Sequence, residues 1–230
     1  MKIEDKLKLK NDDIGDDHVL TSDFTPLRKD AFVKSDDEKI SIIQEHVKGI
    51  METLGLDLSD DSLKGTPKRV AKAYVKEIFG GLNPKLKPTS STFENKYHYE
   101  EMLVEKNINV YSTCEHHFLP IVGKAHVAYI SNGNVIGLSK INRIVEYYAK
   151  RPQVQERLTK QIVKELQEVL NTKDVACVID AKHLCVNSRG IKDIGSSTVT
   201  SEFGGKFKFD ANARDEFLKY IQLDTSFNGI

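Results

Sequence analysis

Cys114-Glu115-His116-His117 places one cysteine and two histidines in four consecutive residues, between two runs that have the composition of β-strands. These runs, about residues 107 to 112 and 122 to 130, predict a tight turn mounted on paired strands. A Cys-x-x-His spacing lets both ends of such a turn reach one metal ion, and zinc takes sulfur and nitrogen ligands. On its own the motif is a weak signal, because short Cys/His clusters also arise by chance.

A second ligand-rich stretch, His183-Leu184-Cys185, ends a run rich in β-forming residues that begins at Val175. As an unbroken strand, this run would place Cys177, His183 and Cys185 on one face, with His183 and Cys185 about 7 Å apart. One of these last two side chains would then bind a metal while the other stands beside it.

Cys177 tests the alternative of a closed structural site with three cysteines and one histidine. An unbroken strand would separate Cys177 from Cys185 by roughly 26 Å, too far for both to touch one ion. Cys114, His117 and Cys185 then remain as three ligands with a vacant fourth position, which is the arrangement of catalytic zinc.

The composition is that of an ordinary globular protein: 230 residues, 39% hydrophobic and 30% charged, so we expect one domain with a tail. Basic and acidic residues balance at 34 each, so no overall field favours nucleic acid or an anionic membrane. No membrane-spanning run and no signal-peptide core is present, and three cysteines suit a reducing compartment. We therefore expect a cytoplasmic protein.

Residues 1–34 are polar, of mixed charge and without a sustained apolar period, which predicts a flexible N-terminal arm before a domain of residues 35–230. The alternative is a regulatory or subunit-bridging arm, in which Phe24, Leu27 and Phe32 dock on a neighbour. Both interpretations remain open from the sequence.

Residues 35–82 predict a helical part. Ser35 and Glu38 form a capping box before an apolar stripe that ends at Gly55, and Thr66-Pro67 begins a second helix that Gly80-Gly81 ends. Arg69 and Lys72 fall outside the apolar stripe of the second helix. A solvated basic face and an anion site are both open for them.

Two further helices are expected after a loop-like segment from Asn83 to Tyr99. Ser139 is expected to cap the first, with Lys140 and Arg143 beside its N-terminus, an arrangement that suits phosphate. Pro152 is expected to restart the helix, with an apolar stripe that leaves Gln155 and Glu156 to one side. With strands near residues 175–186 and 196–200 and a last helix from Asn212, the order indicates an α+β domain with an antiparallel sheet.

Several stretches together resemble the GTP cyclohydrolase I family, zinc-dependent type, from about Asp36 to Leu218. They are Cys114 to His117, Gly137 to Arg143, Arg151 to Arg157, His183 to Val186 and Thr66 to Lys72. The resemblance implies the tunnelling fold (T-fold): an antiparallel sheet with helices on one face in residues of about 100–225, an N-terminal helical hairpin and an oligomeric β-barrel. It also implies a homo-oligomer, typically a decamer, with active sites at subunit interfaces.

The resemblance further implies a hydrolase that converts GTP and water to 7,8-dihydroneopterin triphosphate and formate, at the entry to folate and related pterins. One Zn²⁺ per subunit would be held by Cys114, His117 and Cys185. The other implied contacts are guanine with Gln155 and Glu156, ribose with Ser139, and triphosphate with Arg69, Lys72, Lys140, Arg143 and Arg189. A glutamate carboxylate can accept from both guanine N1–H and the 2-amino group, and adenine has no such pair.

His183 is expected to donate a proton, since its place beside Cys185 puts an imidazole next to the metal, with His116 as a secondary shuttle near the ribose. The alternative is that His183 only orients Cys185 through a hydrogen bond. Two other functions remain open: a tunnelling-fold nitrile reductase, which would use a nucleophilic cysteine without metal, and a non-enzymatic assembly protein stapled by zinc.

Overall fold

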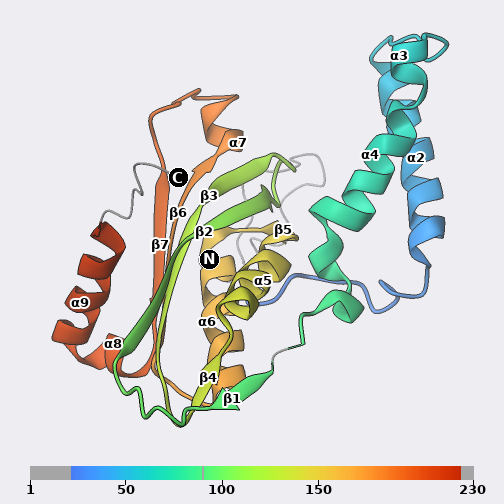
Figure 1. The fold of residues 1–230 in the computed structure, drawn as a ribbon. Coiled ribbons are helices and arrows are strands. Elements are labelled where there is room, and N and C mark those ends of the chain that lie inside the picture. Colours follow the sequence, from blue (N-terminus) through green and yellow to red (C-terminus); the bar gives the residue numbers. More distant parts are fainter. Residues whose placement is uncertain (1–21, 90, 224–230) are drawn as a thin grey trace, which may run out of the picture.

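A computed structural model of the protein describes residues 22–89 and 91–223. Its elements fall into a helical part, which comes first along the chain, and a curled sheet with helices on both faces (Figure 1). This is the α+β class that the sequence predicts. Residues 1–21 of the predicted arm and the last residues of the predicted domain, 224–230, lie outside the described residues.

The helical part begins where the sequence signals it. Helix α2 (Asp36–Thr53) has Ser35 at its N-cap, and the Ser35 hydroxyl and the Glu38 carboxylate each accept from the other residue's backbone N–H, as in a capping box. Helix α3 (Asp61–Lys64) leads into α4 (Thr66–Ala73), which has Pro67 in its first turn. The chain continues through a π-helical turn, η1 (Tyr74–Ile78), and two 3-10 turns, η2 (Gly80–Leu82) and η3 (Pro84–Leu86).

The main sheet has five strands in the order β5-β2-β3-β6-β7. The long hairpin of β2 (Met102–Cys114) and β3 (Pro120–Ile130) is extended by β6 (Val175–His183) and β7 (Thr198–Phe203), all antiparallel. The short β5 (Pro152–Gln153) runs parallel to the end of β2. The four predicted strands are present, although β6 ends at His183 and does not continue to about residue 186. The strand β5 is the parallel exception to the predicted antiparallel sheet.

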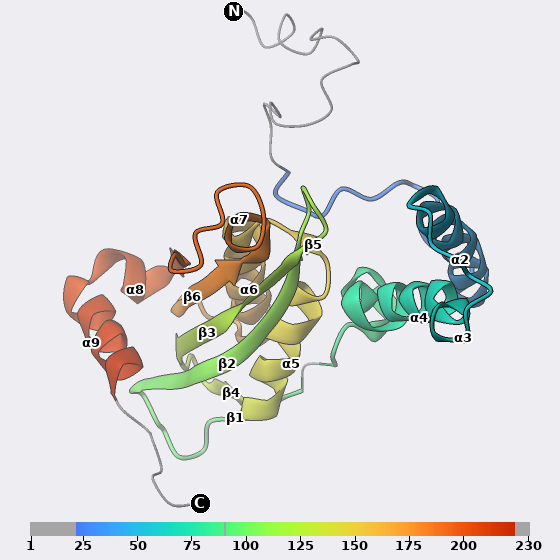
Figure 2. The same cartoon turned by 90° about the horizontal axis from the view of Figure 1, so that it is seen from above.

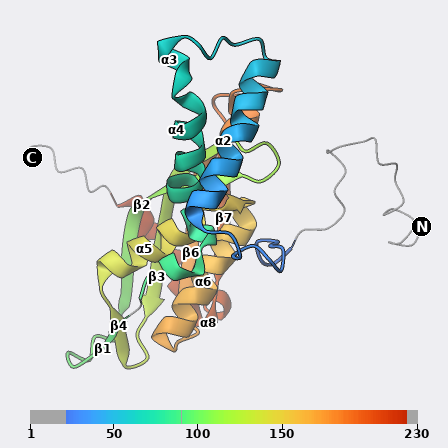
Figure 3. The same cartoon turned by 90° about the vertical axis from the view of Figure 1, so that its right-hand side faces the viewer.

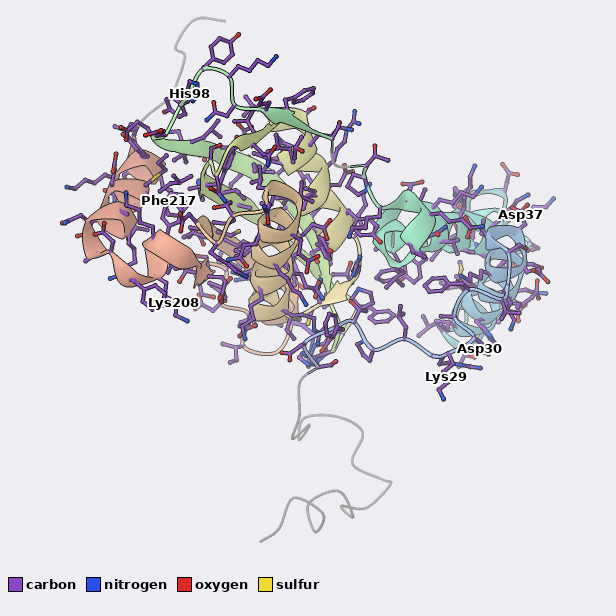
Figure 4. All side chains as sticks on the ribbon, turned by 90° about the horizontal axis from the view of Figure 1, so that it is seen from below. Lys29, Asp30, Asp37, His98, Lys208 and Phe217 are labelled. Carbon is purple, nitrogen blue, oxygen red and sulfur yellow. The ribbon has the colours of Figure 1, made fainter. Side chains whose placement is uncertain are left out.

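Helices cover both faces of the sheet, as seen from above in Figure 2. Helices α5 (Leu138–Ala149) and α6 (Gln155–Leu170) pack on one face and bury the main core with side chains such as Ile141, Leu158 and Ile179. On the other face, α8 (Gly205–Phe209) and α9 (Ala211–Gln222) cover part of the sheet with Phe207 and Phe217. Figure 4 labels Phe217 between α9 and the sheet. The prediction of helices on one face is therefore too narrow.

Three local predictions are wrong. Helix α5 has Gly137 at its N-cap with no side-chain hydrogen bond, so Ser139 lies inside the first turn. Pro152 starts β5 rather than a helix, and α6 begins only at Gln155. The segment from Asn83 to Tyr99 contains β1 (Thr92–Glu94), which pairs with β4 (Asn134–Ile136) in a small second sheet.

The described part of the predicted arm, residues 22–34, runs beside α6 before it reaches α2, as the views in Figures 1 and 3 agree. Lys29 and Asp30, labelled in Figure 4, lie on the stretch that leads to α2. The flexibility of the arm stays a prediction.

Within residues 22–89 and 91–223, no helix is long and apolar enough to cross a membrane.

Gly81 joins the helical part to the sheet domain. Its backbone N–H donates to the Lys150 carbonyl at 2.9 Å. A Cβ added to Gly81 would lie 2.0 Å from the carbonyl oxygen of Tyr147, at the end of α5. This oxygen belongs to the backbone, so it cannot move aside as the end of a flexible side chain could.

We predict that Gly81→Ala lowers the free energy of unfolding by about 2 kcal/mol or more, because the backbones must separate. Gly49→Ala is the matched control: Gly49 lies in α2 with nothing within 4 Å of an added Cβ. It should raise stability by roughly 0.5 to 1 kcal/mol. Urea unfolding of both variants measures the difference, and equal stabilities would contradict the proposed contact.

Candidate metal centre and active site

Three segments meet at one end of the sheet. Cys114 is the last residue of β2, His117 lies in the turn before β3, and Cys185 lies in α7 (Leu184–Asn187), directly after β6. The pairing of Ile121 with His183 sets the end of β6 beside this turn. The candidate ligand atoms of Cys114, His117 and Cys185 all lie within 4.8 Å of one another.

The route by which Cys185 reaches this group differs from the prediction. Strand β6 ends at His183, and the chain turns at once into the short helix α7. His183 and Cys185 therefore do not share a strand face, and the expected spacing along one strand is wrong. The predicted set of three residues nevertheless comes together, because the helical turn brings Cys185 back toward Cys114.

Cys177 is fully buried in the core on β6 and does not belong to this group, as predicted. Its neighbours are apolar residues of the sheet and α6, and burial raises the pKa of its thiol. A neutral, enclosed thiol of this kind acts as a small apolar side chain.

The donor set fits a thiophilic divalent ion. Burial and the adjacent Cys114 thiol, to which Cys185 is hydrogen-bonded, raise the pKa of Cys185 to about 11. A divalent cation between the two sulfurs would reverse this effect by favouring both thiolates. Two sulfurs and one imidazole nitrogen suit zinc, and the exposed side of His117 leaves room for a further ligand.

Two more of the predicted residues contact this group directly. The Arg189 guanidinium donates from Nη1 to His117 Nε2 at 2.8 Å, since a guanidinium has no acceptor. The His116 ring lies with Nδ1 3.8 Å from the Cys114 sulfur. One cation, from the segment after α7, and a second imidazole, from the ligand turn, therefore lie beside the ligand group.

His183 and Gln155 form a hydrogen-bonded pair next to the ligand group. The Gln155 amide nitrogen donates to Ile179 O, Thr198 O and Thr200 Oγ1, which fixes its orientation. Its oxygen therefore faces His183 Nε2, at 2.7 Å, and accepts a hydrogen bond from the Nε2–H. Burial lowers the pKa of His183, while the Glu156 carboxylate acts in the opposite direction.

A cavity of about 1370 Å³ opens beside α6 and the ligand turn. His116, the exposed Glu156 and the buried Arg157 lie on its wall, together with residues farther along α6. The cavity thus connects the ligand turn with the carboxylate that the sequence predicts to select guanine. Its volume is above the range of about 300 to 1,000 Å³ that is typical of small-molecule sites, so the cavity has room for a nucleotide.

The remaining predicted residues lie elsewhere in this single chain. Arg69 donates to Ser62 O and Thr66 Oγ1 within the α3–α4 segment, and Lys72 is exposed on α4. Ser139, Lys140 and Arg143 lie at the start of α5. Among the described residues, none of these five lines the cavity beside α6.

Sequence reasoning missed two features of α6. Gln155 is buried, 1% exposed, although we placed it off the apolar stripe. Because α6 begins at Gln155, the series Gln155, Leu158 and Ile162 has helical spacing, and this signal was available. Arg157 is also buried, and it forms a bidentate ion pair with Glu115 of the ligand turn, with Nη1 2.6 Å from Oε2.

An α+β fold that sets two thiols and an imidazole beside a wide cavity defines a candidate metalloenzyme. A profile of the family named GTP cyclohydrolase I matches residues 43–222. The protein named GTP cyclohydrolase 1 from Flavobacterium johnsoniae is 72% identical over 216 residues, which cover 94% of this chain and 96% of the relative. Another, from Aeromonas salmonicida, is 54% identical over 194 residues, covering 84% and 88%. The chain belongs to the GTP cyclohydrolase I family, as its motifs indicate.

The Gln155 network yields a prediction about stability. Gln155→Glu would set a carboxylate against three oxygen acceptors in a buried place, so we expect a loss of about 3 kcal/mol or more in the free energy of unfolding. Glu156→Gln is the matched control, because it makes the opposite exchange at the neighbouring position. Glu156 is exposed, so this change should shift the free energy of unfolding by no more than about 0.5 kcal/mol. Equal effects in denaturant titrations would show that the Gln155 amide is not fixed in this way.

Proposed function

We propose that the chain opens the imidazole ring of the guanine in GTP, releases formate and forms 7,8-dihydroneopterin triphosphate, at the group of Cys114, His117 and Cys185. Membership of the family supports the reaction. The observation that carries the proposal is the grouping of these three side chains at the end of the sheet where the His183–Gln155 pair also lies. The cavity lined by Glu156 reaches the ligand turn at His116.

Cys114, His117 and Cys185 would hold one Zn²⁺ per subunit. The mixed sulfur and nitrogen set supports zinc over harder ions, which prefer oxygen ligands. When bound, the ion supplies Lewis-acid chemistry, the activation of an oxygen nucleophile near neutral pH. Both cysteine thiols must lose their protons to bind the ion, so the affinity for the metal should fall as the pH is lowered.

His183 would handle the proton at N7 of guanine that ring opening requires. Gln155 holds the His183 ring by its Nε2–H and so fixes which nitrogen carries the proton. Burial lowers the pKa of the imidazole, which makes its protonated form a stronger acid than an exposed histidine. His116 is the proposed second shuttle, on the cavity side of the Cys114 sulfur.

Glu156 would carry guanine recognition, because its exposed carboxylate lies on the cavity wall. The side chain of Gln155 is bonded within the chain at both amide atoms, so its own contact with guanine would require those bonds to break. Two donors on guanine facing one carboxylate account for selection against adenine.

The triphosphate and the ribose would be bound between subunits. Arg69 and Lys72 on α4, and Ser139, Lys140 and Arg143 on α5, lie away from this chain's own cavity, whereas Arg189 lies beside His117. Sites shared between neighbouring copies would bring these cations to one substrate. A neutral chain needs such local gathering of cations to bind a polyanion.

The edges of the sheet support assembly into an oligomeric β-barrel of the tunnelling fold, in a homodecamer, with α2 and α4 as its helical hairpin. Among the described residues, β7 has no partner on its outer side, and β2 has one only at Thr113 and Cys114. Tyr111 and Val122, paired on the sheet face away from α5 and α6, are 64% and 38% exposed. Open edges and exposed apolar residues favour pairing with another copy.

We propose a cytoplasmic enzyme with GTP as substrate and its own copies as partners.

The direct test incubates purified protein with GTP and follows formate together with the ultraviolet band of the dihydropterin product. Both should appear, should stop on adding a chelator, and should return with zinc. Bound zinc without formate would instead indicate a zinc-stapled assembly protein. Reduction of a nitrile on a deazapurine without metal would indicate the reductase.

We predict that Cys114→Ser, His117→Ala and Cys185→Ser each remove stoichiometric zinc and turnover, because a set of two ligands holds the ion poorly. Cys177→Ala is the matched control, since it removes a thiol from the core of the same sheet and should keep both. Metal analysis of the purified variants measures this. Loss of zinc from Cys177→Ala would contradict the ligand assignment.

His183→Ala should keep zinc at full occupancy and still bind GTP, while formate release falls by about 10²- to 10⁴-fold, the usual contribution of a positioned acid. Gel filtration with labelled GTP and a formate assay separate binding from chemistry. Loss of zinc in this variant would favour the alternative, in which His183 only orients Cys185.

A further inference from the structure

The N-terminal segment before α2 lies along one stripe of α6. The Ser22 carbonyl accepts from Arg157 Nε at 2.7 Å, and the Asp23 carbonyl accepts from the Gln161 amide at 3.5 Å. The ring of Phe24 lies 5.1 Å from Lys164 Nζ. Positions 157, 161 and 164 follow one face of a helix, so three consecutive arm residues contact three successive places along α6.

Arg157 connects this segment to the ligand turn. Its Nη1 and Nη2 donate to the two carboxylate oxygens of Glu115, at 2.6 and 3.1 Å, while its Nε donates to Ser22. All three guanidinium nitrogens are therefore used, and the side chain is only 3% exposed. Such a planar fork is held in one orientation when every nitrogen has a partner.

Glu115 is the residue between the proposed ligand Cys114 and the imidazole of His116. Its backbone N–H donates to Gln153 O at 3.0 Å, and Cys114 is the partner of Gln153 in the pairing of β2 with β5. The turn is thus attached to β5 by its backbone and to α6 by the Glu115 side chain. A shift of Glu115 would move the adjacent sulfur.

We propose that Arg157 is a positioning residue that couples docking of the arm segment Ser22–Phe24 to retention of the metal ion by the ligand turn. The docked segment holds the Arg157 guanidinium, the guanidinium holds Glu115, and Glu115 fixes the turn that carries Cys114 and His117. The inference rests on the proposed zinc site. It assigns to the arm a role in the stability of the metal centre of its own subunit.

Coupling of this kind works in both directions. If docking of the arm strengthens the binding of zinc, bound zinc must strengthen docking of the arm by the same factor. A side chain that only stabilises the fold would not transmit the presence of zinc to residues 22–25. This reciprocity separates a positioning role from a general structural one.

The first measurement is the rate of zinc release from the full-length protein into an excess of chelator. Arg157→Met should speed release by about tenfold or more, as for other residues that orient metal ligands, and Arg157→Lys should give an intermediate rate. Lys160→Met is the matched control: Lys160 is an exposed residue of the same helix, and among the described residues no hydrogen bond or ion pair joins its side chain to Glu115 or to the arm. It should release zinc at the parental rate.

Arg157→Met leaves the Glu115 carboxylate without its guanidinium partner, which can prevent folding. Phe24→Ala avoids this problem, because Phe24 is 63% exposed and contacts α6 through Lys164. Loosening the arm there should speed zinc release by about 2- to 5-fold, the value of one such contact.

The second measurement is hydrogen exchange of the backbone amides in residues 22–25, with and without zinc. In the parent, removing zinc should speed exchange; in Arg157→Met, exchange should be fast in both states. The coupling would be overturned if the hydrogen exchange of residues 22–25 were the same with and without zinc. It would also be overturned if Phe24→Ala released zinc at the parental rate. A parent that binds no zinc would overturn the proposed metal site itself, whereas a parent that binds zinc without the coupling leaves that site intact.

Discussion

The register of three antiparallel strands is the constraint on which the site depends. Ile121 pairs with Ser112 on one side and with His183 on the other, so the end of β2, the start of β3 and the end of β6 lie at one level. The ligand turn and α7 then project from the same end of the sheet. Because side chains alternate along a strand, a slip of one residue would turn Ile121 out of the core and move His183 from the turn.

The elements that the sequence predicted are those fixed by local patterns. The capping box of Ser35 and Glu38, the apolar stripes of α5 and α6 and the long hairpin follow from short-range spacing, and each is confirmed. The three metal-ligand candidates were also found, because sulfur and imidazole are scarce in this chain and their pattern is distinctive. Long motifs then indicated the family to which the chain belongs.

The features that were missed depend on where an element stops or on contacts far apart in the sequence. β6 gives way to α7 at Leu184 although the residues there favour a strand, and this turn brings Cys185 to Cys114. The burial of Gln155 and Arg157 depends on partners from β7 and the ligand turn, and no local pattern names those partners. The cations on α4 and α5 lie outside this chain's cavity, so their predicted role depends on other copies.

In the proposed site, two cysteines and one histidine from separate segments bind one zinc ion. X-ray absorption of the zinc-loaded protein tests this most directly, because it counts the scatterers around the metal. We predict two sulfurs at about 2.3 Å, with nitrogen or oxygen ligands at about 2.0 to 2.1 Å completing a four-coordinate site. A shell of three or four sulfurs, or one with no sulfur, would contradict it.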